Sequence, residues 1–306
     1  MTAVLRTMSR SLRALLPVIL GLWSLVGQGQ DGLGHDGWPG ALTAEIKALG
    51  DARTEAAQDS ISARVKAVLR PVLEAPDAFD RTFAGIPITA VDAADGRFRL
   101  FTWNLARPDG THRYEGLLLV SDGRRRAVYE LRDMTERIAA PESTELGPEN
   151  WYGALYYEVV PVKQGGRTWY TLLGWKGHSR VETRKVIEVL TFRGGKPRFG
   201  APLFTAEEPA AGGGRRIKPQ RRVFAYAAQA TMSLKRDPRA ERIVFDHLSP
   251  TRPDLGNDAA FRGPDLSYDA YLWEKGLWRF QRDVDARDLD MARPWNAPPK
   301  EGRSKF

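Results

Sequence analysis

One imidazole in this chain of 306 residues lies beside a carboxylate inside a strand-like run. The run is VFDHLSP, in which Asp246 directly precedes His247. Neighbouring side chains of a strand point to opposite faces, so Asp246 is poorly placed to orient His247 as a catalytic dyad requires. A hydrolytic site would therefore need a carboxylate from another strand, such as Asp265 or Asp269. The alternative is a histidine that makes a hydrogen bond at a strand end.

Acidic residues two positions apart form a second pattern, in GPDLSYDAY and DVDARDLD. If extended, the first run places Asp265, Ser267 and Asp269 on one face. The second run does the same for Asp283, Asp285 and Arg287. Clustered carboxylates can bind calcium or share a proton in hydrolysis, but neither run fits the known calcium loop. Structural turns with ion pairs, a metal site and catalysis remain the alternatives, and we assign no metal ligands.

Motifs for cofactors are missing from the sequence. The chain has no cysteine, and its four histidines are scattered singly, which argues against a zinc site. There is no G-x-S-x-G elbow, phosphate-binding glycine loop or dinucleotide fingerprint. We therefore expect no cofactor. The lack of cysteine also excludes disulfides, so stability must come from a buried core.

Aromatic residues are the other candidates for a functional role. Tryptophan and tyrosine exposed along a sheet would suit a glycan or a peptide, because they offer flat apolar area with a polar handle. The candidates for such a ligand-binding face are Trp151, Tyr156, Trp175 and Trp273. The alternative is that these rings fill a core between layers.

Strand-like runs rich in β-branched and aromatic residues follow one another after Pro76. They span 97–105, 114–120, 127–133, 151–160, 168–175, 185–192, 222–234, 242–248, 268–273 and 277–285. Short turn-forming links such as Asp122-Gly123 separate most of them, which is typical of antiparallel hairpins. We predict a mainly β domain over 77–292, a large antiparallel sheet assembly resembling a sandwich or a barrel-like meander. In RFRLFTWNL apolar residues fall on both faces, which predicts a strand covered on both sides.

Apolar residues recur at helical spacing between Leu42 and Val72, within an N-terminal helical segment over 31–76. Gly50-Asp51 offers a stop and Asp59-Ser60 a cap, which predicts one interrupted helix or two short ones ending near Pro71. Two further segments have little to bury and are predicted to be irregular, a flexible insertion at 205–220 and a tail at 293–306.

The first thirty residues have the order of a secretory signal peptide. Three arginines precede an apolar stretch from Ala14 to Val26, and small or polar residues follow it. The stretch is too short to span a bilayer as a helix. We therefore expect 1–30 to be cleaved, leaving a periplasmic or extracellular protein with no integral membrane segment. Basic clusters at 124–126 and 215–222 lie in predicted loops, and export argues against a nucleic-acid partner.

A resemblance follows from the motifs WYGALYY, YTLLGW, VIEVLTF, AQATMSL, IVFDHL and GPDLSYDAY in that order. Over roughly 80–285 the chain is similar to a group of exported bacterial proteins with no established activity, so the resemblance implies export and assigns no site. AADGRFRLFTW also resembles the turn of periplasmic propeller repeats, although Ala93-Ala94 stand where Ser-Pro would be. An incomplete β-propeller is therefore the alternative fold.

The sequence leaves two hypotheses for the function. The first is a non-catalytic envelope or secreted protein that binds a ligand such as a glycan or a peptide, which the lack of a recognisable nucleophile or cofactor loop favours. The second is a periplasmic hydrolase built on His247 with Asp246, Asp265 and Asp269. The hydrolase requires these side chains to converge in one cleft.

Overall fold

The computed structural model describes residues 37–205, 218–256 and 258–286. No described helix is both long enough and apolar enough to cross a membrane. Three predictions lie wholly or mostly outside the described residues, namely the signal segment 1–30, the insertion 205–220 and the tail 293–306.

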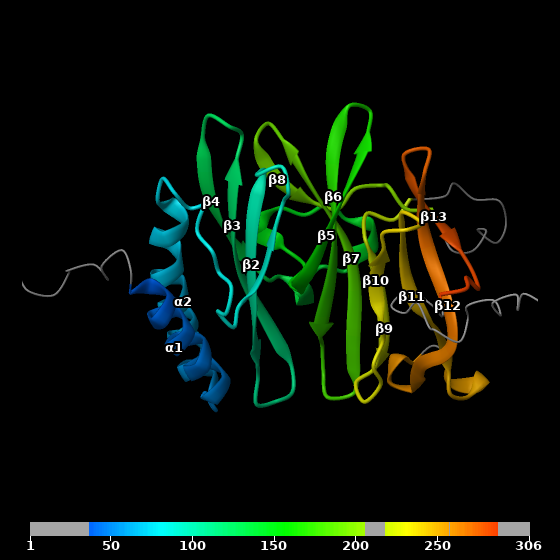
Figure 1. Cartoon of the computed structure of the whole chain (residues 1–306). Coiled ribbons are helices and arrows are strands. Elements are labelled where there is room, and N and C mark those ends of the chain that lie inside the picture. The colour runs from blue at the N-terminus through cyan, green and yellow to red at the C-terminus, as the bar shows by residue number, and fades with distance from the viewer. Residues whose placement is uncertain (1–36, 206–217, 257, 287–306) are drawn as a thin grey trace, which may run out of the picture. The chain divides into compact units, whose positions relative to one another are not determined.

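Two helices open the described chain, α1 (Trp38–Asp51) and α2 (Glu55–Glu74) (Figure 1). The hydroxyl of Thr54 caps α2 by accepting a backbone hydrogen bond in its first turn. The cap predicted at Asp59-Ser60 is therefore wrong, because both residues lie inside the helix. The predicted end near Pro71 is also too early, since α2 continues to Glu74.

Each helix buries one apolar face. Together with one face of the first sheet they form a shared core. Its helical members are Trp38, Leu42, Leu49, Ile61, Val65, Leu69, Val72 and Leu73. Helical spacing in the sequence predicted most of these positions, because residues three and four apart share a face.

The strands of the described residues form three antiparallel sheets. The first has the order β1 (Thr89–Asp92), β2 (Phe98–Ala106), β3 (His112–Ser121) and β4 (Arg126–Arg132). The second contains β5 (Leu155–Gln164), β6 (Arg167–Gly177), β7 (Glu182–Arg193), β8 (Lys196–Phe199) and β9 (Arg222–Ala227), with β8 and β9 both pairing with β7. The third has the order β10 (Leu234–Asp237), β11 (Arg242–Pro250), β12 (Arg262–Glu274) and β13 (Leu277–Gln281). A mainly β antiparallel assembly with a helical segment is thus confirmed.

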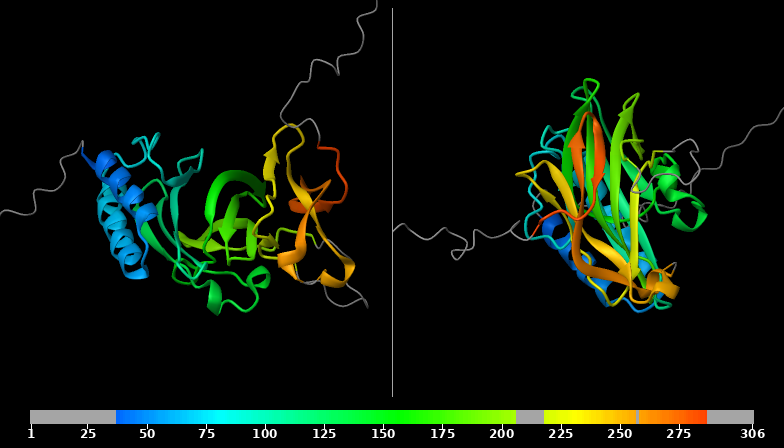
Figure 2. Two further views of the ribbon diagram at one scale, coloured as in Figure 1. Left: turned by 90° about the horizontal axis from the view of Figure 1, so that it is seen from below. Right: turned by 90° about the vertical axis from the view of Figure 1, so that its right-hand side faces the viewer.

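The helices and sheets are stacked in one order, joined by three successive cores. The first core lies between the helices and the first sheet, the second between the first and second sheets, and the third between the second and third sheets. Figure 2 shows the same order from another direction. No core joins the first sheet to the third within the described residues, so the stack is open and no sheet closes into a barrel. Like the incomplete β-propeller considered as the alternative fold, this stack contains three consecutive antiparallel meanders.

Strand β2 shows why the alternation in RFRLFTWNL is mixed. Phe98 and Leu100 enter the core shared with the second sheet, whereas Phe101, Trp103 and Leu105 enter the core shared with the helices. All five side chains are buried. The predicted cover on both faces is therefore confirmed, since a strand between two layers needs apolar residues on each side.

Several predicted strands differ from those observed. Strand β12 begins at Arg262, six residues before the predicted run 268–273, and β13 ends at Gln281, not at 285. The run 151–160 enters β5 only at Leu155, because residues 152–154 form an irregular approach to the strand. The run 222–234 contains β9 and then a turn in which Ala230 N–H donates to Ala227 O, and it reaches only the first residue of β10. Short strands β1 and β8 were not predicted, because four residues give too few alternations to detect.

A fully buried ion pair fastens the loop before β5 to the second sheet. Arg221 donates from Nε to Glu188 Oε2 at 2.7 Å, and both side chains are 0% exposed. Its Nη2 donates to the carbonyl of Phe199 at 3.0 Å. Its Nη1 donates to the carbonyls of Pro141 and Thr144. One guanidinium thus satisfies a buried carboxylate, two backbone carbonyls of the loop before β5 and one at the end of β8.

Lys176 is a second buried cation. Its side chain is enclosed by the rings of Tyr114 and Tyr152, and Nζ lies 4.4 and 4.7 Å from their centroids. Nζ donates to Thr135 Oγ1 at 2.8 Å and to the carbonyl of Gly153 at 2.6 Å. Burial lowers the pKa of Lys176 from its ordinary 10.5 to about 8.

Removing the buried guanidinium is expected to destabilise the fold strongly. Arg221→Met should lower the free energy of unfolding by about 3–5 kcal/mol, because Glu188 is left buried and uncompensated. The control Arg193→Met removes an ion pair with Glu145 from a side chain that is 71% exposed, and should cost about 1 kcal/mol or less. Denaturant titration measures both variants. Equal effects of the two variants would contradict the role assigned to Arg221.

Lys176 predicts a specific dependence of stability on pH. Below pH 8 the amine is protonated in both the folded and the unfolded protein, so it adds no slope. Between about pH 8 and 10.5 only the unfolded chain holds the proton, so stability rises with pH by about 1.4 kcal/mol per unit from this group. The free energy of unfolding of wild type minus that of Lys176→Met should show this rise. A flat difference across the range would refute the shifted pKa.

Candidate functional site

The predicted site residues meet at an irregularity between β11 and β12. Asp246 pairs with Tyr268 and Leu248 pairs with Pro264, so one residue of β11, His247, lies opposite three residues of β12. We call these three, 265–267, the β12 bulge. Bulges interrupt the ladder and re-aim side chains, and they occur often beside functional sites.

Leu266 at the centre of the β12 bulge has an unusual conformation. Its φ is 73°, a left-handed backbone that is unfavourable for a residue with a Cβ, and its side chain is 93% exposed. The carboxylate of Asp265 supports the turn by accepting hydrogen bonds from the backbone N–H of Ser267 at 3.1 Å and from its hydroxyl at 2.7 Å. The turn therefore holds an apolar side chain out in solvent at a cost in backbone energy.

His247 is oriented by a buried carboxylate. Its Nδ1 lies 2.7 Å from Asp269 Oδ2, and Asp269 is 4% exposed. The other oxygen of Asp269 accepts the backbone N–H of Asp283 at 3.0 Å. A carboxylate oxygen accepts hydrogen bonds, so this contact favours the tautomer of a neutral imidazole that carries its hydrogen on Nδ1 and has Nε2 as the acceptor.

Asp265 and Ser249 lie on the Nε2 side of the imidazole. Asp265 Oδ2 is 3.9 Å from Nε2 and accepts a hydrogen bond from the hydroxyl of Ser249. Partial burial raises the pKa of Asp265, but the hydrogen bonds from Ser249 and Ser267 outweigh it and hold that pKa below its ordinary value. Asp265 is therefore ionised at neutral pH. Ser249 donates to Asp265 and so is not activated as a nucleophile by His247.

Asp246 lies apart from this group, as the alternation of a strand requires. Its Oδ2 accepts the backbone N–H of Ser233 at 2.7 Å, and burial raises its pKa above the ordinary value. Three of the four predicted acid–base residues thus converge, and Asp246 does not orient His247. Within the described residues, no group of histidine and acidic side chains is arranged to hold a metal ion.

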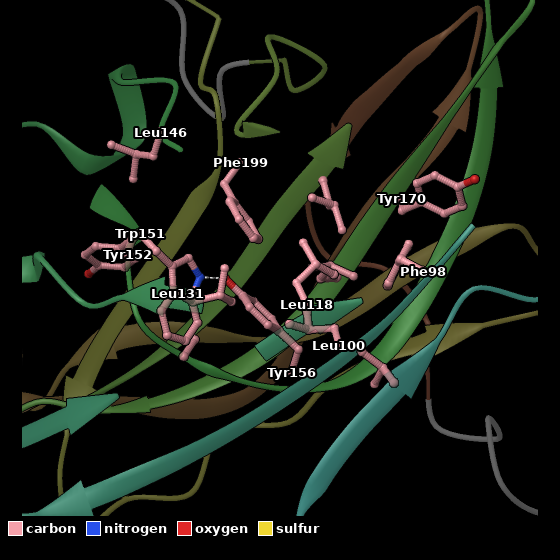
Figure 3. Close-up of a cluster of buried hydrophobic side chains, with 14 of the residues drawn as sticks. Phe98, Leu100, Leu118, Leu131, Leu146, Trp151, Tyr152, Tyr156, Tyr170 and Phe199 are labelled. Atoms are coloured by element: carbon pink, nitrogen blue, oxygen red, sulfur yellow. Dashed lines mark hydrogen bonds between the residues drawn. The ribbon is translucent and has the colours of Figure 1, made fainter. Parts of the chain in front are cut away.

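Two of the four predicted ligand-binding aromatics have no open face. Trp151 and Tyr156 are 0% exposed, and Trp151 Nε1 donates to the Tyr156 hydroxyl at 3.2 Å (Figure 3). Their burial in the core between the first two sheets corrects the expectation of a shared aromatic face. Trp175 and Trp273 are partly exposed on different sheets. Trp273 packs edge-on against Trp278 at 5.1 Å.

Sequence reasoning missed Ser249 and Leu266. Ser249 stands two residues after His247, so alternation along the strand could have placed both on one face. Nothing in the sequence marks Leu266, because left-handed positions usually carry glycine or asparagine.

Comparison of this chain with protein-family models, with curated proteins and with solved structures finds no match. The resemblance to exported bacterial proteins therefore stays a prediction from sequence. A role for the β12 bulge is argued from its geometry alone.

Proposed function

We propose that this chain is an exported binding protein whose ligand site is the β12 bulge, and that the ligand is a peptide with a basic side chain beside an apolar one. Export rests on the signal-like segment 1–30 and is part of the proposal. The ligand class follows from what the bulge presents, an ionised carboxylate on Asp265, an acceptor nitrogen on His247 and an exposed leucine.

The observation that carries this proposal is the exposed and strained Leu266. A left-handed backbone costs a non-glycine residue about 1–2 kcal/mol. Packing among the described residues does not repay this cost, because the side chain is 93% exposed. A partner that covered the leucine would gain about 1.5–3 kcal/mol from its burial.

The polar half of the site is rigid. Asp269 fixes the imidazole of His247, and Ser249 and Ser267 fix the carboxylate of Asp265. Groups already held in place lose little freedom when a ligand binds. A peptide is favoured over a glycan, because two aromatic rings that would stack on a sugar are buried instead.

Hydrolysis is the second candidate, and one contact favours it. The 2.7 Å contact between Asp269 and His247 Nδ1 has the geometry that prepares an imidazole to act as a general base on water. Ser249 plays no part in this candidate as a nucleophile.

The binding proposal is tested with two acetylated peptides, one of alternating leucine and lysine and one of alternating leucine and glutamate. The first should bind more tightly, measured by fluorescence anisotropy at low salt. Asp265→Asn keeps the turn but removes the charge, and should weaken binding about tenfold. Leu266→Gly should weaken binding similarly and raise the free energy of unfolding by about 1 kcal/mol.

The control for charge is Asp254→Asn, which removes an exposed carboxylate paired with Arg252 outside the β12 bulge. It should leave peptide affinity unchanged. Equal affinity for the two peptides, or equal effects of Asp254→Asn and Asp265→Asn, would remove the basis of the proposal.

The hydrolytic candidate predicts turnover of p-nitrophenyl acetate that depends on the imidazole. His247→Ala should abolish the turnover, and Asp269→Asn should lower it about 100-fold or more, since the orienting carboxylate is lost. Wild-type turnover no faster than that of His247→Ala would exclude this candidate and leave the binding proposal standing.

A further inference from the structure

A cavity of about 410 Å³, widely open to solvent, lies between the loop containing Pro141 and the second sheet. Its apolar walls come from Pro141 and from Val223 and Ala225 on β9. Its polar side chains include Tyr152, from the approach to β5, and Arg184 on β7. The residues that line this cavity belong to neither β11 nor β12, so it is separate from the β12 bulge.

Tyr152 brings an unused hydrogen-bond donor to the cavity. The residue is 1% exposed, and its hydroxyl oxygen accepts a hydrogen bond from Arg184 Nη1 at 2.8 Å. In Figure 3 this hydroxyl points away from the other labelled side chains of the core. No described residue accepts the hydrogen of this hydroxyl, so it is available to an acceptor that enters the cavity.

Arg184 brings further donors. Its Nε pairs with Glu182, and its Nη1 donates to Tyr152. Its Nη2 makes no hydrogen bond to any described residue. Two of the three guanidinium nitrogens are therefore engaged, and the N–H groups of Nη2 are available to a ligand.

The acidic group of the cavity is already engaged. Glu142 Oε1 accepts the backbone N–H of Val223 at 2.8 Å and lies 3.2 Å from Arg222 Nη1. Behind Tyr152 lies the ammonium of Lys176, 4.7 Å from the ring centroid. The donors that face a ligand in the cavity thus come from Tyr152 and Arg184, and Arg184 also brings positive charge.

We propose that this cavity binds a small monocarboxylate with an apolar body. The carboxylate accepts hydrogen bonds from the Tyr152 hydroxyl and from Arg184 Nη2, and the body lies against Pro141, Val223 and Ala225. A volume of about 410 Å³ is at the lower end for small-molecule sites, which fits a compact acid. This site is independent of the proposed function at the β12 bulge.

The test compares hexanoate with 1-hexanol, and 3-phenylpropanoate with 3-phenylpropanol, by NMR titration of the full chain at pH 7. At least one carboxylate should bind about tenfold or more tightly than its alcohol. Absence of binding by both acids, or equal affinity of acids and alcohols, would overturn the proposal.

Three variants locate the binding. Tyr152→Phe keeps the ring and removes only the hydroxyl, and Arg184→Met removes the guanidinium. Each should weaken carboxylate binding about tenfold while leaving affinity for the alcohol unchanged. The control Arg193→Met removes an exposed guanidinium elsewhere on β7 and should have no effect on binding. Thermal unfolding checks each fold, and Tyr152→Phe decides the question if Arg184→Met does not fold. Unchanged carboxylate affinity in Tyr152→Phe would refute the assigned site.

Discussion

The buried pair of Arg221 and Glu188 is the interaction on which the middle of this structure depends. Its guanidinium binds carbonyls from the loop before β5 and from the end of β8, while Glu188 lies within β7. The pair therefore fixes the loop that forms one wall of the cavity lined by Tyr152 and Arg184. A charge without a partner is costly to bury, so this geometry tolerates few alternatives.

The elements with long periodic patterns could be predicted from the sequence. Helical spacing identified the buried faces of α1 and α2, and mixed alternation identified β2 as a strand between two layers. The error at the start of α2 arose because several nearby residues could have capped the helix. Thr54 served as the cap although Asp59 and Ser60 offered the same chemistry, because the turn after α1 needs only three residues. Strands β1 and β8 were too short to leave a periodic signal.

The sequence predicted some residues of the candidate site, but not which of them make contact. Alternation correctly separated Asp246 from His247, and Asp269 was among the carboxylates considered. Which carboxylate meets the imidazole is decided by the register of β12, and that register changes at a bulge whose central residue is a leucine. Tyr152 and Arg184 escaped notice for another reason, since they are distant in sequence and only the fold of the second sheet brings them together.

The open stack of layers has a consequence for chain synthesis. The middle sheet has apolar side chains on both faces, one covered by β1–β4 and the other by β10–β13. A nascent chain that ends after β9 would have a partner for only the first of these faces. The other apolar face would remain exposed to water until the last four strands are synthesised. The incomplete polypeptide would therefore be prone to self-association and would benefit from a holding chaperone.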